Sequence, residues 1–144
     1  MKTTYIYLLL IIPIFAFCDL NIDKVNRVLS GLESTKVLKF YNANTSLKHK
    51  LQSMNTPLHF TTKQQADIWL FPTSTQGDKL LIVNSYSALK KNEQRIIGAI
   101  YTKKGRTQIF FVRERLNAKG LKLPANMEKY LISECYLHSI CLLQ

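Results

Sequence analysis

The sequence predicts an α/β fold: a three-layer sandwich around a mainly parallel sheet of about five strands, closed by a C-terminal antiparallel hairpin. Two observations lead to this fold class. Short apolar runs alternate with segments of helical periodicity through the first two-thirds of the chain, which is typical of β–α–β units. Further along, two strand-like runs flank the segment KKGR, which is typical of a β-hairpin.

The first eighteen residues have the build of a secretory signal peptide. One lysine precedes an apolar run from Ile6 to Phe17, which is shorter than the roughly 20 residues of a membrane span. Cleavage after Cys18 is favoured by the small side chain of Ala16 two positions earlier. The alternative is lipoprotein anchoring at Cys18, and the bulky Phe17 argues against it. We therefore expect export to the periplasm.

Helices and strands are expected to alternate through the first half of the mature chain. The segment DLNIDKVNRVLSGLES (19–34) places its apolar residues on one helical face and offers Asp19 and Asn21 as candidate caps. Three shorter elements should follow, a strand at 36–42, a helix at 45–54 and a weak strand at 57–62.

Two nearly continuous apolar runs predict the centre of the sheet. ADIWLFP (66–72) ends at a proline, and KLLIVNS (79–85) follows the turn sequence STQGD. Strands this apolar are typically buried on both faces of a parallel sheet. The segment YSALKKNEQ after the second run has room for one or two helical turns.

The hairpin is predicted from RIIGAIYT and TQIFFV, which flank KKGR. Gly105 can adopt the positive φ that such turns require. RERLNAKGL then reads as a helix that ends at Gly120, and PANMEKYLI as another with Pro124 near its first position. Residues 19–132 should therefore form a single α/β domain, followed by a tail at 133–144.

Cys135 and Cys141, in the tail sequence ECYLHSIC, are expected to form a disulfide. They are the even pair that remains once Cys18 leaves with the leader of an exported chain. The bridge would pin the tail. A metal site made of both thiols and His138 would have three ligands at unfamiliar spacing, and an oxidising compartment would remove the thiols. We expect neither a metal nor a cofactor.

The order ADIWLFP, KLLIVNSYSAL, IIGAIYTKKGRTQIFFVRERLNAKGLKLPANMEKYL resembles that of the YfiR-like family of small periplasmic regulators. The same order is similar to one lobe of type 2 periplasmic solute-binding proteins. The resemblance covers about residues 36–132 and consists of apolar blocks and glycines. It implies a secreted α/β protein that acts by binding, because YfiR-like proteins restrain a membrane partner and solute-binding lobes hold a small ligand.

Positive charge dominates the chain, with a formal net charge of +11 and a pI near 9.7. Such a charge favours acidic partners. The sharpest local cluster is Lys103, Lys104 and Arg106 in the turn, followed by Arg113 and Arg115. We predict that these five residues bind the acidic face of a membrane or envelope protein. An equally supported interpretation is that the charges only keep the hairpin edge from pairing with other strands.

A nucleic-acid partner is not expected, because the aromatic residues lie inside the strands instead of beside the cations. A small-ligand-binding lobe is the alternative function. Ligands of open α/β sheets collect at the carboxyl ends of strands, and a small anion would suit the charge of the chain. The candidate ligand-binding residues lie at the carboxyl ends of the two central strands and are Thr73, Ser74, Asn84, Ser85 and Tyr86.

No catalytic motif is recognisable. His49, His59 and His138 lie on different predicted elements, and no serine stands in a G-x-S-x-G sequence. TKKGRT lacks the frame of a phosphate-binding loop. We therefore expect the protein not to be an enzyme.

Overall fold

The computed structural model describes residues 20–143, so the predicted leader at 1–18, with Cys18, lies outside the described residues. Seven strands are described: β1 Lys39–Tyr41, β2 His59–Phe60, β3 Ile68–Leu70, β4 Leu80–Val83, β5 Ile96–Lys103, β6 Arg106–Val112 and β7 Leu131–Ile132. The α-helices are α1 Ile22–Ser30, α2 Thr45–Gln52, α3 Tyr86–Leu89, α4 Arg113–Ala118 and α5 Glu134–Leu137. Two 3₁₀ helices, η1 Ala125–Tyr130 and η2 Ile140–Leu143, accompany them.

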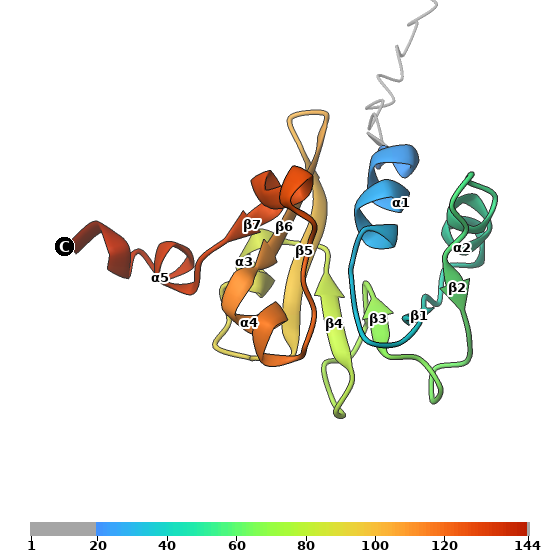
Figure 1. Cartoon of the computed structure of the whole chain (residues 1–144), viewed down its shortest axis with the longest axis horizontal. Coiled ribbons are helices and arrows are strands. Elements are labelled where there is room, and N and C mark those ends of the chain that lie inside the picture. Colours follow the sequence, from blue (N-terminus) through green and yellow to red (C-terminus); the bar gives the residue numbers. More distant parts are fainter. Residues whose placement is uncertain (1–19, 144) are drawn as a thin grey trace, which may run out of the picture.

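All seven strands belong to one sheet, in the order β2-β1-β3-β4-β5-β6-β7 (Figure 1). Strands β1 to β5 are parallel, β6 is antiparallel to β5, and β7 runs parallel to β6. The predicted α/β class with a mainly parallel sheet and an antiparallel hairpin is confirmed. The sheet has seven strands where about five were expected.

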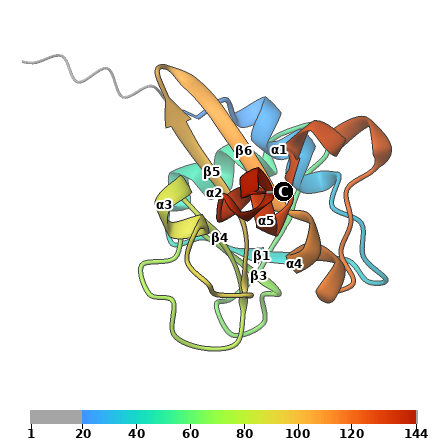
Figure 2. The same ribbon diagram turned by 90° about the vertical axis from the view of Figure 1, so that its left-hand side faces the viewer.

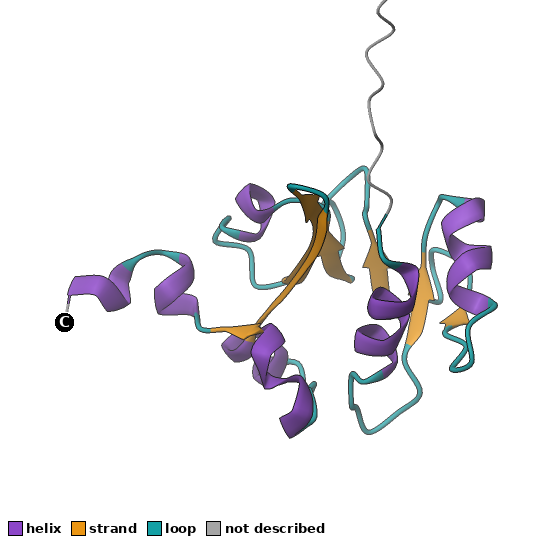
Figure 3. Ribbon diagram, turned by 90° about the horizontal axis from the view of Figure 1, so that it is seen from above, coloured by secondary structure: helices purple, strands orange, loops and turns teal. Residues whose placement is uncertain are grey.

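The central strands are buried on both faces, as their apolar runs predict. Ile68 and Leu70 of β3 belong to an apolar cluster that includes residues of α1 and α2. Trp69, which points the other way, belongs to a second cluster with Leu89 of α3 and Leu137 of α5. This division follows from the alternation of side chains along a strand. The helices therefore flank the strands on both sides (Figure 3).

Local signals set the ends of the helices. The side chain of Asn21 caps α1, accepting the backbone N–H of Lys24 at 3.1 Å. Helix α4 ends as predicted near Gly120, whose φ is +68°. The N–H groups of Gly120 and the following residue donate to carbonyls of Asn117 and Leu116, so the last turn is closed by paired hydrogen bonds.

The hairpin between β5 and β6 is closed by the two-residue turn Lys104-Gly105. Both residues have positive φ, 50° and 74°, which is the conformation of a type I′ turn. Gly98, at the base of the hairpin, is also required, because a Cβ there would lie 2.7 Å from the carbonyl oxygen of Phe110. The hairpin is therefore specified by glycines at its tip and at its base.

The segment 124–132 differs from the predicted helix. Pro124 precedes the 3₁₀ helix η1, and the chain then extends as β7. Leu131 and Ile132 pair with Phe111 and Val112, so β7 covers an edge of β6 that would otherwise have free backbone groups. The need to cover this edge overrides the local helical pattern.

Candidate functional site

The outer half of the β5–β6 hairpin is a two-stranded arm (Figures 1 and 2). The last pairing of β5 with β4 is at Ala99, and β7 pairs with β6 only at Phe111 and Val112. Residues 100–109 therefore pair only with each other, ending at the pair Lys103–Arg106. We call residues 100–109 the basic arm. Its tip is the part of the hairpin farthest from the rest of the sheet.

The tip of the basic arm carries three exposed cations, Lys103, Lys104 and Arg106. None of them takes part in an ion pair between described residues. Elsewhere in the described chain, ion pairs join five other Lys or Arg side chains to carboxylates. The tip thus presents positive charge that the described part of the molecule does not compensate.

Helix α1 holds the basic arm at Thr107. The Thr107 hydroxyl accepts the backbone N–H of Asn21 at 2.8 Å, and the Thr107 carbonyl accepts the Lys24 ammonium at 2.9 Å. Thr107 itself is buried. These contacts fix the arm relative to the domain below its tip.

Aromatic rings support one side of the arm. The ring centroids of Tyr101 and Phe110 are 6.4 Å apart, and Tyr86 of α3 meets Phe110 edge-on at 5.7 Å. Burial raises the pKa of the Tyr101 phenol, with a smaller contribution from Tyr86. The phenol is therefore neutral at physiological pH, and this side of the arm adds packing without charge.

Arg113 lies at the other end of β6 from the tip. It begins α4, is exposed, and pairs with Glu128 at 3.1 Å. Its charge is therefore partly compensated, and it does not join the cluster at the tip.

Arg115 is fully buried, which corrects its placement in the predicted contact surface. Its Nε and Nη2 atoms donate to the two carboxylate oxygens of Glu134 at 2.9 and 2.6 Å. Its remaining donors reach the carbonyl oxygens of Leu89, Lys91 and Ile96 at 2.9–3.1 Å. This guanidinium is a structural cross-link between the sheet and the tail.

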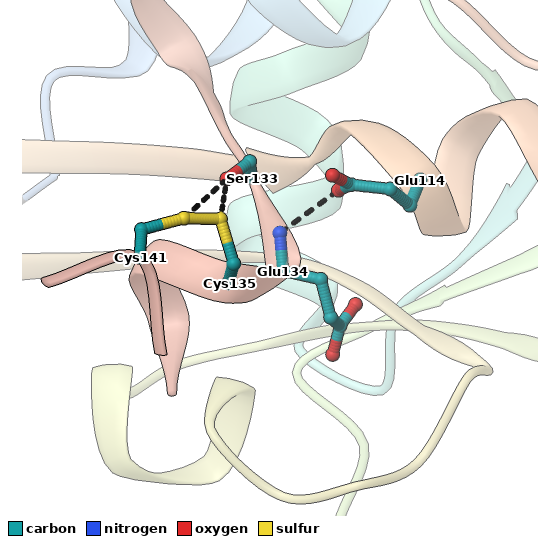
Figure 4. Close-up of a disulfide and its surroundings, with 5 residues drawn as sticks. All are labelled: Glu114, Ser133, Glu134, Cys135 and Cys141. Carbon is teal, nitrogen blue, oxygen red and sulfur yellow. Dashed lines mark hydrogen bonds between the residues drawn. A yellow bond between two sulfur atoms is a disulfide. The ribbon is translucent and has the colours of Figure 1, made fainter. Parts of the chain in front are cut away.

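Glu134 is held as a carboxylate by the same contacts. The hydrogen bond from Arg115 is the main cause that keeps the pKa of Glu134 below its ordinary value of 4.5. Burial acts in the opposite direction and is outweighed, while His138, 3.0 Å away, adds to the lowering. The backbone N–H of Glu134 also donates to Glu114 of α4 at 2.9 Å (Figure 4).

The tail beyond Glu134 is closed by its two cysteines (Figure 4). Cys135 and Cys141 lie at disulfide distance, with their Cα atoms 5.1 Å apart, so the predicted pairing is confirmed. The Ser133 hydroxyl lies 3.1 Å from the sulfur of Cys135. Such a pair is compatible with an oxidising compartment.

The five predicted ligand-binding residues occupy two places. Thr73 and Ser74 line a small cavity at the carboxyl end of β3, together with Tyr41, Lys63 and Trp69, which sequence reasoning did not single out. The other three begin or precede α3. There the Ser85 hydroxyl caps the helix, the Tyr86 ring packs in the second apolar cluster, and Asn84 is exposed.

The three histidines remain apart. His49 is exposed on α2, His59 is exposed on β2, and His138 contacts Glu134. Between residues 20 and 143, no group of three or more His, Cys, Asp or Glu side chains is arranged to hold a metal ion. Within the same part of the chain, no helix has the length and apolar character needed to cross a membrane.

A scan against models of protein families finds no match, and searches of curated proteins and of solved structures find none either.

Proposed function

We propose that this is an exported, non-enzymatic protein that acts by protein–protein contact in the periplasm. It would regulate a membrane partner, as its resemblance to YfiR-like proteins suggests, or form a small component of an envelope assembly. The basic arm is the contact surface. The geometry of the arm and the positive net charge of the chain support this proposal. A cysteine pair compatible with an oxidising compartment supports the expected export.

One observation carries the proposal: three uncompensated cations at the end of a fixed arm. Lys103, Lys104 and Arg106 are exposed on a type I′ turn, and contacts with α1 hold the arm in place below them. A surface whose backbone is already ordered loses little conformational entropy when it binds. The arm therefore suits recognition better than an equally charged flexible loop would.

The chemistry of the tip specifies an acidic partner. A cationic patch on a chain of net charge +11 accelerates encounter with a negative surface and disfavours positive ones. Exposed charges are screened beyond about 8–10 Å at physiological salt. Binding through the arm should therefore weaken as salt concentration rises.

Replacing the three cations with glutamates separates recognition from protection of the hairpin edge. Glutamate also discourages unwanted strand pairing, because any charge at an edge opposes it. If the cations served only that purpose, the variant Lys103→Glu, Lys104→Glu, Arg106→Glu (the tip reversal) would behave like the wild type. If they recognise an acidic face, it would bind at least about tenfold more weakly.

The test is capture of envelope proteins by the mature chain, at low and at high salt, with wild type and tip reversal side by side. A matched control reverses three exposed lysines away from the arm, Lys50, Lys90 and Lys119, and changes the net charge equally. We expect one protein to be retained by wild type and control, and lost with the tip reversal and at high salt. Equal retention by all three chains would exclude the basic arm as the contact.

A further inference from the structure

The cavity lined by Thr73 and Ser74 lies where the strand order of the sheet reverses. The chain leaves β1 for β2 on one side and then returns to β3 on the other side of β1. The loops that follow β1 and β3 therefore diverge from each other at the carboxyl ends of these two strands. Ligands of open α/β sheets bind at such points. The cavity there has a volume of about 40 Å³ and is lined by both loops.

Phe71, which lines the cavity, has an unusual backbone conformation. Alternation along β3 would place the side chain of residue 71 on the same face as Trp69. Phe71 instead has φ of +51°, and its ring packs in the other apolar cluster, on the face of Leu70. The Trp69 face is thus left without the side chain that a regular strand would place there.

Phe71 is held in this conformation by its neighbours. Its N–H donates to the carbonyl of Ile82 on β4 at 2.8 Å. Positive φ is rare for a bulky residue, and such residues persist where the surroundings enforce them, often at binding sites.

A buried amide joins the two strands beside the cavity. The side chain of Asn42, directly after β1, donates to the carbonyl of Leu70 at the end of β3 at 2.9 Å. Its oxygen accepts the N–H of Asn44 at 2.8 Å. Asn42 therefore links the chain after β1 to the end of β3, next to residues that line the cavity.

Lys63 provides the charge of the cavity. Its carbonyl accepts the Trp69 indole N–H at 2.9 Å, and its ammonium lies 5.0 Å from the centre of the Trp69 ring. The backbone of Lys63 is thereby tied to the ring that forms the cavity wall. An ammonium over a ring keeps N–H donors free for an anion. Thr73 and Ser74, which are exposed residues of the lining, carry hydroxyls that can donate further hydrogen bonds, and the lining contains no carboxylate.

The size of the cavity restricts the ligand. Its volume of about 40 Å³ exceeds the about 10–15 Å³ that one water needs, but is far below the about 300–1,000 Å³ of sites for drug-sized molecules. Only a small ion or the head group of a larger molecule would fit.

We propose that this cavity binds a small oxyanion, a carboxylate or phosphate group, between Lys63 and the hydroxyls of Thr73 and Ser74, against the Trp69 ring. The proposed anion site shares no residue with the basic arm. An experiment that excludes one of the two proposals therefore leaves the other untouched.

Trp69 makes the test direct, because it is the one tryptophan of the whole chain. Its emission is recorded while sodium acetate or sodium phosphate is added at constant ionic strength, with sodium chloride as reference. We expect a saturable change for at least one oxyanion, complete by about 100 mM if the dissociation constant is about 1 mM or lower. Saturation by acetate alone assigns a carboxylate site, and by phosphate alone a phosphate site.

Two variants complete the experiment. Lys63→Gln should weaken the oxyanion at least about tenfold, since it removes a charged hydrogen-bond donor. The matched exposed control Lys50→Gln should bind like the wild type, and so should the tip reversal. Thermal melting with and without the anion provides a second readout, because a bound ligand raises Tm. A response that is absent, unsaturable, equal for chloride or unchanged in Lys63→Gln overturns the proposal.

Discussion

The tip of the basic arm and the Arg115 site both concentrate positive charge, and they treat it in opposite ways. At the tip, Lys103, Lys104 and Arg106 are exposed and have no carboxylate partner among the described residues. At the other site, Arg115 is fully buried, and each of its five N–H donors has an acceptor.

The difference shows what each charge can do. A cation in water keeps its hydration and is available to a partner, but contributes little to stability. A buried guanidinium has lost its hydration, so the protein must supply every acceptor, and the loss of one partner is costly. Charge at the tip therefore suits recognition, and charge at Arg115 suits assembly of the fold. Four predictions test this division, beginning with the largest effect.

Arg115→Ala should lower the free energy of unfolding by about 3–5 kcal/mol, because it removes both guanidinium hydrogen bonds to Glu134 and the Arg115 donors of the buried carbonyls of Leu89 and Ile96. Urea denaturation measures this directly. The control Arg113→Ala removes an exposed pair with Glu128 and should change the same quantity by less than about 1 kcal/mol. Similar losses for the two variants would contradict the contrast drawn above.

Removal of the disulfide should have an intermediate effect. The double variant Cys135→Ser, Cys141→Ser opens a short loop, for which the chain-entropy model gives about 2 kcal/mol. The loss should be concentrated in the tail, where amide hydrogen exchange of residues 134–141 should accelerate. Exchange in the basic arm should not change, and a faster rate there would show that the two regions are coupled.

Acid should weaken the Arg115 site through Glu134. The pKa of Glu134 is lowered in the folded protein, chiefly by the hydrogen bond from Arg115. The ionised carboxylate therefore stabilises the folded state, and this contribution to the free energy of unfolding is fully present well above pH 4.5. That contribution is lost as pH falls from about 4.5 through the folded-state pKa, at about 1.4 kcal/mol for each unit of lowering. Unfolding free energies measured from pH 7 to 3 should fall less steeply in Glu134→Gln, whatever its stability at pH 7. An unchanged slope would remove Glu134 as the cause.

The tip reversal should have the smallest effect on stability, within about 0.5 kcal/mol, because its three side chains make no described ion pair. Its Tm should match that of the wild type while its binding to the acidic partner is lost. A large drop in Tm would mean that the cations at the tip support the fold after all.

The elements predicted well from sequence are those that local signals specify. KKGR gives the turn, Gly120 ends α4, and the apolar runs give β3 and β4, because each signal acts within a few residues. Strand β7 was missed because it depends on the free edge of β6, which no local pattern reveals. The disulfide could be predicted from the sequence, because only two cysteines remain once Cys18 is assigned to the leader.

The candidate site could be predicted only in part from the sequence. The exposed tip follows from the hairpin itself, but Arg115 was grouped with it by charge alone. Its spacing offered a signal: in VRERL, Arg115 stands three residues after buried Val112 and beside buried Leu116, on the inward phase of α4. Its partner Glu134 lies in the tail, so only the tertiary structure identifies the pair. The same holds for Lys63, which meets Trp69 through a loop.

The hairpin also has a consequence for the time course of folding. It is the one antiparallel pair in the described sheet, joined by two residues, whereas its parallel partners need crossover connections. Hairpins of this kind close in about 1–10 μs, and pairings between distant segments are slower. We expect the basic arm to form early and the Arg115 cross-link, which needs the tail, to form last. The folding chain would then present its cationic turn before the rest of the sheet is complete.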